Sequence, residues 1–211
     1  MSYVKKACDN ALTGLIFFIY YVWALGTHMM FFPKVTWKDK SVKKLLDGPC
    51  ILVANHTHHN DGSFIPHVFW GHRIYTLVMT KWYDNPKLHV FFSHLPYLPI
   101  NLYDADTSWI EGVKDVLKKG KPVLIFPEGK LNFEPELAEF LPGFLMPARQ
   151  LDFEVPVIPM CIRGGYKLFH QEEIIVGTPL EFDVHQKGRP SLVLKEGAEM
   201  CRQTIQGMLS E

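Results

Sequence analysis

A histidine and an aspartate in the first third of the chain have the types and spacing needed for acid–base chemistry. His56 and Asp61 stand five positions apart, directly after the apolar run 51–54. Residues five apart in an α-helix are rotated by about 140° around its axis, so the two side chains would not share a face if both were helical. We therefore expect His56 on the loop that leaves a strand and Asp61 in the first turn of the next helix, where an acid is favoured.

This placement suits a histidine that acts as a general base. The Asp61 carboxylate can accept a hydrogen bond from one imidazole nitrogen of His56, which leaves the other nitrogen free to take a proton. The chain has no GxSxG elbow, so we expect His56 to activate a hydroxyl of the substrate. A second acidic segment, Glu128 and Gly129, follows the apolar run 123–126. Two such segments at strand ends have the layout of an active site.

Three imidazoles close together also raise the possibility of a metal site. His56, His58 and His59 are followed by Asp61 in the order H-x-H-H-N-D. The metallo-β-lactamase order is H-x-H-x-D-H, so the acid falls one place late, and an HExxH motif is absent. A metal-dependent hydrolase that uses this cluster is the more distant alternative, and we expect no metal at the site.

The overall composition argues against a nucleic-acid binder. The 211 residues suggest one domain with a full core, and 22 basic against 22 acidic side chains leave no basic field. The four cysteines are far apart and fit no zinc or redox motif. Cys50 and Cys161 lie in strand-like apolar runs, where we expect buried reduced thiols, which fits the cytoplasmic side of a membrane.

The N-terminal segment is expected to associate with a membrane. Residues 11–32 contain no Lys, Arg, Asp or Glu, and a span needs about 20 apolar residues. Gly14 and Gly26 interrupt this run and lysines flank both ends, so we expect helices that dip into the bilayer and return. A buried core helix and a signal peptide are the weaker alternatives. The chain then divides into a membrane-associated helical segment, 1–35, and a main domain, 36–211.

Short apolar runs alternate with helix-like patterns through the rest of the chain. This alternation predicts an α/β sandwich of two or three layers, with a mixed, largely parallel sheet flanked by helices. The polar, basic segment 34–48 is expected to be a linker or a surface helix. Strands are expected at 50–54, 74–79, 98–102, 123–126, 157–162 and 174–176, with 180–182 as a further candidate. Helices are expected at 61–70, from 86 onward, from after 106–107 to 120, and at 194–209.

Three motifs occur in a fixed order through the middle of the chain. The pattern N-H-x4-D is formed by Asn55, His56 and Asp61, F-P-E-G spans 126–129, and V-P-V-I-P spans 155–159. In this order and behind an apolar N-terminus, the motifs resemble those of the glycerolipid acyltransferase family. That family is typified by the 1-acylglycerol-3-phosphate acyltransferases of phospholipid synthesis.

The resemblance implies transfer of a fatty acyl group from acyl-CoA or acyl carrier protein to a hydroxyl of a lysophospholipid such as 1-acylglycerol-3-phosphate. His56 would take the hydroxyl proton and Asp61 would orient it, with the thioester as co-substrate and no other cofactor. Asn55, Glu128 and Gly129 would hold the acceptor or the loop around it. The expected partners are the bilayer, the lysolipid and the acyl donor, on the cytoplasmic face of a membrane.

Two departures from the family pattern concern the acceptor. The third block usually continues as E-G-T-R, whereas here Lys130 and Leu131 follow the glycine, and Leu102 stands where the second block usually has an arginine. The implied phosphate contacts then fall to Lys130, Lys81 and Arg163. Lysine supplies a point charge without the bidentate fork of arginine. A lysolipid with a head group other than phosphate, or a non-catalytic lipid binder, therefore stays open as an alternative.

Overall fold

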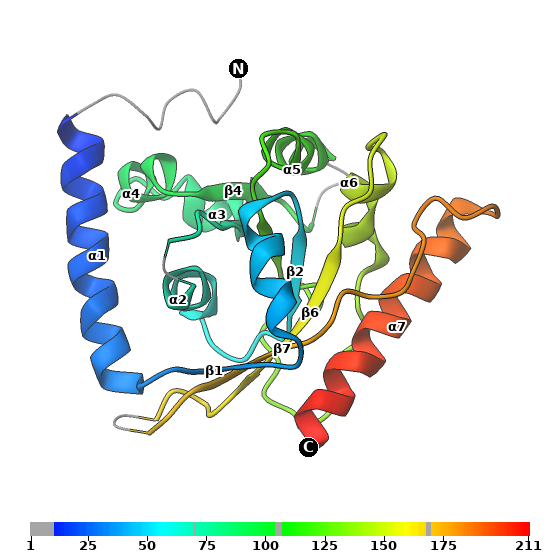
Figure 1. Cartoon of the computed structure of the whole chain (residues 1–211). Helices are drawn as coiled ribbons and strands as arrows, with labels where there is room; N and C mark the ends of the chain where they lie inside the picture. The colour runs from blue at the N-terminus through cyan, green and yellow to red at the C-terminus, as the bar shows by residue number, and fades with distance from the viewer. Residues whose placement is uncertain (1–10, 70, 104–106, 168–169) are drawn as a thin grey trace.

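The computed structural model describes residues 11–69, 71–103, 107–167 and 170–211, and its centre is a seven-stranded sheet (Figure 1). The strands are β1 (Lys34–Trp37), β2 (Ile51–Ala54), β3 (Tyr75–Met79), β4 (Tyr97–Ile100), β5 (Val123–Ile125), β6 (Val157–Arg163) and β7 (Glu173–Val176). Their order is β1-β7-β6-β2-β5-β3-β4, and every neighbouring pair is parallel except β6 and β7. The mixed, largely parallel sheet expected from the sequence is confirmed.

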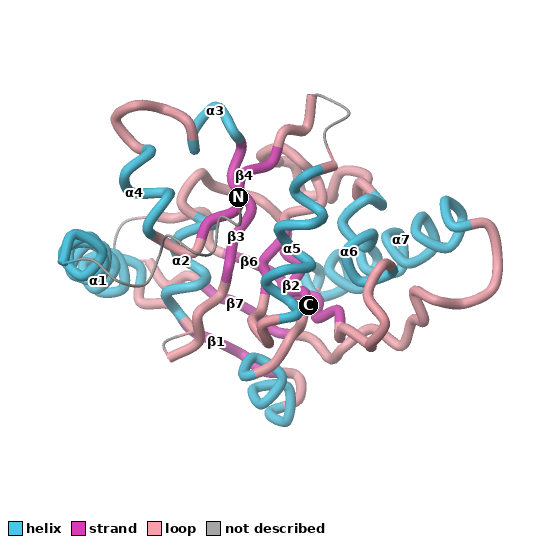
Figure 2. Tube along the Cα trace, turned by 90° about the horizontal axis from the view of Figure 1, so that it is seen from above, coloured by secondary structure: helices cyan, strands magenta, loops and turns pink. Residues whose placement is uncertain are grey.

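Helices cover both faces of the sheet, so the fold has three layers. They are α1 (Ala11–Phe31), η2 (Lys40–Asp47), α2 (Asp61–Val68), α3 (Thr80–Tyr83), α4 (His89–His94), α5 (Ser108–Lys118), η3 (Pro142–Leu145), α6 (Met146–Arg149) and α7 (Pro190–Ser210). Ile51 and Val53 of β2 join one apolar cluster and Leu52 and Ala54 join another, because successive strand residues point to opposite faces. Helices α5, α6 and α7 cover the first cluster, and α1, α2 and η2 cover the second (Figure 2).

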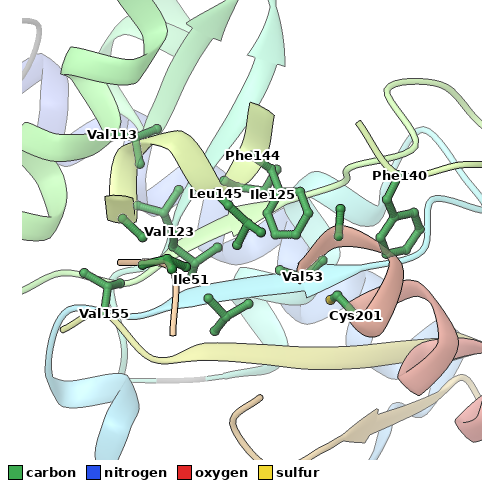
Figure 3. Packing of buried hydrophobic residues seen from close by; sticks show 14 of the residues in the cluster. Ile51, Val53, Val113, Val123, Ile125, Phe140, Phe144, Leu145, Val155 and Cys201 are labelled. Carbon is green, nitrogen blue, oxygen red and sulfur yellow. The ribbon is translucent and has the colours of Figure 1, made fainter. Parts of the chain in front are cut away.

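The first of these clusters fixes the two strands that lead into the candidate site. Ile51 and Val53 of β2 and Val123 and Ile125 of β5 are buried in it together with Leu145 of η3 (Figure 3). The two strands are neighbours and pair in parallel, with Ile51 opposite Val123. Because parallel strands end at the same edge of a sheet, the polar segments that follow β2 and β5 must lie side by side.

Helix α1 is one unbroken helix of 21 residues, so the expectation of several helices within this segment is not met. Gly14 and Gly26 lie inside it, and a glycine costs a long helix only about 1 kcal/mol. Its buried stripe includes Ile16, Tyr20 and Ala24, and the helix packs against α2 and α4. Its other side exposes Leu15, Phe18, Ile19, Val22, Leu25 and Met29. Expectations for residues 1–10 lie outside the described residues.

The segment 34–48 differs most from its prediction. It contains β1 and η2 instead of a linker or one helix, and the expected domain boundary after residue 35 falls inside β1. Strand β1 pairs with β7, far along the chain, so no local pattern announces it. The further strand candidate 180–182 is a loop, although the Leu180 amide donates to the Val157 carbonyl at 2.8 Å. The expected helix end at Trp70, and Asp106 before the third expected helix, lie outside the described residues.

Candidate active site

His56 and Asp61 meet at the carboxyl end of β2, as their spacing predicts. His56 lies on the loop that leaves β2, and Asp61 is the first residue of α2. Their side chains are joined by a 2.9 Å hydrogen bond between His56 Nδ1 and Asp61 Oδ2. The carboxylate must accept here, so Nδ1 carries the proton and Nε2 is the basic nitrogen.

The Asp61 carboxylate is held by the loop it faces as well as by the imidazole. Asp61 is fully buried, and its Oδ2 atom also accepts from the backbone amides of Thr57 at 2.8 Å and His58 at 2.9 Å. Three donors on one oxygen fix the position of a buried charge whose desolvation is otherwise costly. The loop conformation and the position of His56 therefore depend on the same carboxylate.

The imidazole of His56 is packed on one side and open on the other. Its ring stacks on Phe126, with centroids 4.3 Å apart and an angle of 20° between the planes. The side chain is 22% exposed and borders a large, mostly apolar cavity. Phe126 follows β5, so the adjacency of β2 and β5 gives the imidazole its packing partner and leaves its other edge at the cavity.

Glu128 binds the backbone around His56 rather than the open cavity. It is 5% exposed, and its Oε1 atom accepts from the His56 amide at 3.0 Å. Its Oε2 atom accepts from Asn132 Nδ2 at 2.7 Å and from the Ala138 amide at 3.0 Å. The Asn132 amide returns a bond to the His56 carbonyl at 2.8 Å. Sequence reasoning missed Asn132, because no motif marked it and only the fold brings it to the first segment.

The side chains of Asn55, which follows β2, and of Arg163, the last residue of β6, both make hydrogen bonds within the protein. Asn55 is buried, and its side-chain amide exchanges two hydrogen bonds with the backbone of Ile162, at 2.8 and 3.1 Å. Arg163 donates to the Met208 carbonyl of α7, and its Nη1 atom lies 3.7 Å from Glu173 Oε2. Arg163 does not border the cavity at His56, so the structure does not bring it to the predicted acceptor site.

Gly129 occupies a position that only glycine fits without strain. Its φ is +67°, and a Cβ atom there would lie 2.9 Å from Leu141 and 3.4 Å from Leu102. Its amide closes a turn on the Phe126 carbonyl at 3.1 Å. The glycine therefore lets the chain turn sharply beside His56 and brings the next residue, Lys130, to the cavity.

A large cavity of about 930 Å³ opens in front of His56. Most of its wall is apolar and comes from α1, β3, α4 and β4 and from the loop after β5. Lys81 of α3 and Lys130 border it, and both are exposed. The other side chains of the wall include Ile19, Trp23, Leu77, Met79, Phe91, Phe92, Ile100, Leu102, Trp109, Leu131 and Phe144. A space of this size and lining suits a hydrocarbon chain with a charged group at its mouth.

The histidine cluster does not form a metal-ligating set. Among the described residues, no three His, Cys, Asp or Glu side chains are grouped so that they could hold an ion. The thiols of Cys50 and Cys161 are free and buried, as predicted. Burial raises the pKa of Cys50 to about 12 and that of Cys161 to about 11, so both are protonated at neutral pH. Cys8 lies outside the described residues.

Comparison with known protein families agrees with the histidine–aspartate pair and its cavity. Residues 33–163 match the family model described as Acyltransferase, and the chain belongs to that family. The matched range contains all three motifs quoted above and both polar segments at the site.

Two similar proteins carry more specific descriptions. The chain is 28% identical over 129 residues to a Caenorhabditis elegans protein described as "Putative 1-acyl-sn-glycerol-3-phosphate acyltransferase acl-1", which covers 58% of this chain and 46% of that protein. The chain thus spans about half the length of this relative. The crystal structure of the 1-acyl-sn-glycerophosphate (LPA) acyltransferase PlsC from Thermotoga maritima superposes with a TM-score of 0.62, at 17% identity, over 93% of this chain and 86% of that one. The second similarity shows that the fold is shared.

Proposed function

We propose that this protein transfers a fatty acyl group from a thioester, acyl-CoA or acyl carrier protein, to a hydroxyl of a lysophospholipid such as 1-acylglycerol-3-phosphate. One observation carries the proposal. The Nδ1 atom of His56 is held by a buried carboxylate, and its imidazole borders an apolar cavity large enough for an acyl chain. Membership of the Acyltransferase family and the description of the nematode relative support the same reaction.

The reaction follows from the geometry of the pair. His56 Nε2 takes the proton of the acceptor hydroxyl as its oxygen attacks the thioester carbonyl carbon. A tetrahedral intermediate forms, and the imidazolium is stabilised by the Asp61 carboxylate bound to its Nδ1–H. The intermediate collapses with breakage of the carbon–sulfur bond, and the imidazolium returns its proton to the leaving thiolate. The products are an ester and a free thiol, and no enzyme nucleophile is used.

The two cations at the cavity mouth are the groups that we assign to the acceptor phosphate. Lys130 follows the glycine turn beside His56, and Lys81 lies in the short helix α3 that follows β3. Either ammonium can approach a phosphate without the fixed geometry that arginine imposes. A second candidate acceptor, a lysolipid without a phosphomonoester, is favoured by Leu102 and Leu131, which make that part of the wall apolar.

We also propose that the protein associates with a membrane through α1, on the cytoplasmic face. Residues 13–31 form a helix long and apolar enough to cross a bilayer, and its outward side carries large apolar side chains. Ile19, Tyr20 and Trp23 of the same helix border the cavity at His56. A lipid acceptor could therefore pass from the bilayer to the site along the helix that touches both.

The proposed function is tested by acyl transfer assays on wild type and H56A in mixed micelles. One labelled acyl-CoA and one acyl carrier protein are offered with a panel of lysolipids, and the product is read by mass. We expect loss of at least a thousandfold in kcat for H56A, because the base is removed. The exposed His185 is the matched control, and H185A should keep full activity. Transfer that survives in H56A, or activity that chelation removes from wild type, would contradict the mechanism.

A further inference from the structure

One oxygen of the buried Asp61 carboxylate, Oδ1, accepts none of the hydrogen bonds at the site. Oδ2 carries all three donors, whereas Oδ1 is buried and has no hydrogen-bond partner among the described residues. The hydroxyl of Tyr166 is likewise buried and has no hydrogen-bond partner among the described residues. Its ring stacks on His58, whose backbone amide donates to Asp61 Oδ2, so the phenol belongs to the immediate surroundings of the carboxylate. The carboxylate oxygen is thus a buried acceptor without a partner and the phenol is a buried donor without a partner, and each alone would be costly.

The backbone that carries Tyr166 is held in an unusual conformation. Gly164, Gly165 and Tyr166 have φ angles of +134°, +81° and +52°. The positive value is uncommon for a residue with a side chain, and such conformations concentrate at functional sites. The Tyr166 amide donates to the buried Glu172 carboxylate, which occupies the space where a side chain at Gly164 would begin. The loop after β6 is therefore built around the position of this tyrosine.

The ring of Tyr166 is fixed on three sides. It stacks on His58 with centroids 4.6 Å apart and meets Phe31 and Phe64 edge-on, each at 5.3 Å. It does not border the cavity in front of His56. Tyr166 thus approaches Asp61 from behind, on the side away from substrate, and could act on the reaction only through the carboxylate.

The direction of the contact follows from the charge states. Burial, with the nearby Asp61 carboxylate adding to it, raises the pKa of Tyr166 well above its usual range. The phenol is therefore protonated at any pH at which the enzyme works, and it can only donate to a carboxylate.

We propose that Tyr166 is a positioning residue that donates its phenol proton to Asp61 Oδ1, so that the catalytic pair is the front of a Tyr166–Asp61–His56 chain. This inference rests on the proposed function of His56 and Asp61. A donor on Oδ1 stops the carboxylate from rotating about its Cβ–Cγ bond and keeps Oδ2 toward His56 Nδ1. It also draws charge from the carboxylate, which limits how strongly Asp61 holds the imidazolium and so eases return of the proton to the leaving thiolate.

The test is Y166F, which removes the hydroxyl and keeps the ring contacts. We expect kcat to fall about tenfold, as for loss of a hydrogen bond to a charged group, with KM unchanged within about twofold. The acidic limb of the pH profile of kcat/KM should move to higher pH, because a carboxylate without its donor favours the imidazolium form of His56. Y166F does not change the other titratable groups around the pair, so a shift of the acidic limb can be assigned to the lost hydroxyl. These groups are His58, Glu172 and Glu128 beside the pair, and His59, Lys81 and Lys130 at the cavity.

The buried phenol of Tyr83, away from the pair, provides the matched control, and Y83F should leave the acidic limb unchanged. A Y166F enzyme with wild-type kcat and an unmoved acidic limb overturns the inference. So does a Y166F enzyme that loses activity only together with a lower Tm and a higher KM, because that pattern marks a purely structural role. H56A run in parallel separates the two hypotheses: if H56A is inactive and Y166F is normal, the base stands and only the role of Tyr166 fails.

Discussion

The surroundings of His56 and the mouth of the cavity next to it are built in opposite ways. Around His56, two buried carboxylates each accept three hydrogen bonds, and most of the donors are backbone amides. At the mouth, Lys81 and Lys130 are exposed single charges on an otherwise apolar wall. The difference teaches that, under the proposed function, the catalytic histidine is held in place by the protein, whereas the head group of the acceptor would meet two exposed single charges.

The largest effect is expected from E128Q, which disturbs the hydrogen bonds that hold the backbone around His56. Every oxygen of Glu128 faces a donor, so the amide nitrogen introduced by the substitution meets an N–H whichever way it turns. We expect the free energy of unfolding to fall by about 2 kcal/mol and kcat to fall about a hundredfold, because His56 is displaced. Chemical denaturation and steady-state assays measure the two effects. E134Q, at an exposed glutamate in the same loop, should change neither, and an E128Q enzyme with wild-type kcat would show that the base does not need this scaffold.

K130A tests the proposed role of the exposed lysines at the cavity in binding the acceptor head group. We expect KM for 1-acylglycerol-3-phosphate to rise about tenfold, the equivalent of about 1.4 kcal/mol of binding, with a smaller change in kcat. The reason is that an ammonium at the cavity mouth contacts the head group and not the reacting atoms. K130R should recover most of the affinity, and K195A on the exposed side of α7 should have no effect. An unchanged KM with the phosphorylated acceptor removes Lys130 from the site and favours the acceptor without a phosphomonoester.

The smallest expected effect comes from filling the apolar part of the cavity with G143L. Gly143 borders the cavity, and a Cβ atom there would meet nothing within 4 Å. Added methylenes should exclude the end of a long chain, so the rate ratio of an 18-carbon to a 14-carbon acyl donor should fall about fivefold. Competition assays with mixed donors measure this ratio. G207L in α7, which is equally free of neighbours, leaves the ratio unchanged if the cavity holds the acyl chain, whereas equal shifts in both variants would contradict that assignment.

The sequence predicted the positions of those elements that depend on patterns within a few residues. Apolar runs of strand length predicted β2, β5 and β6 to within a residue or two, and the five-residue spacing predicted both positions of the His56–Asp61 pair. The sequence did not predict β1, which pairs with β7, more than 130 residues further along the chain. It also selected Arg163 because the residue follows a conspicuous strand, whereas packing turns the side chain toward α7. A strand-end position can be read from sequence, but the direction of a long side chain cannot.

The sequence by itself determined that a histidine and an aspartate, five residues apart, follow one buried strand, and that a glutamate and a glycine turn follow another. These are consequences of residue type, spacing and strand length, which act over a few residues. Only the tertiary structure decided that the two strands are neighbours, that Glu128 holds the backbone of His56, and that the ring of Tyr166 packs on His58 next to the pair. Those contacts join segments far apart in the chain, and they form because close packing of the sheet and its helices brings these segments together.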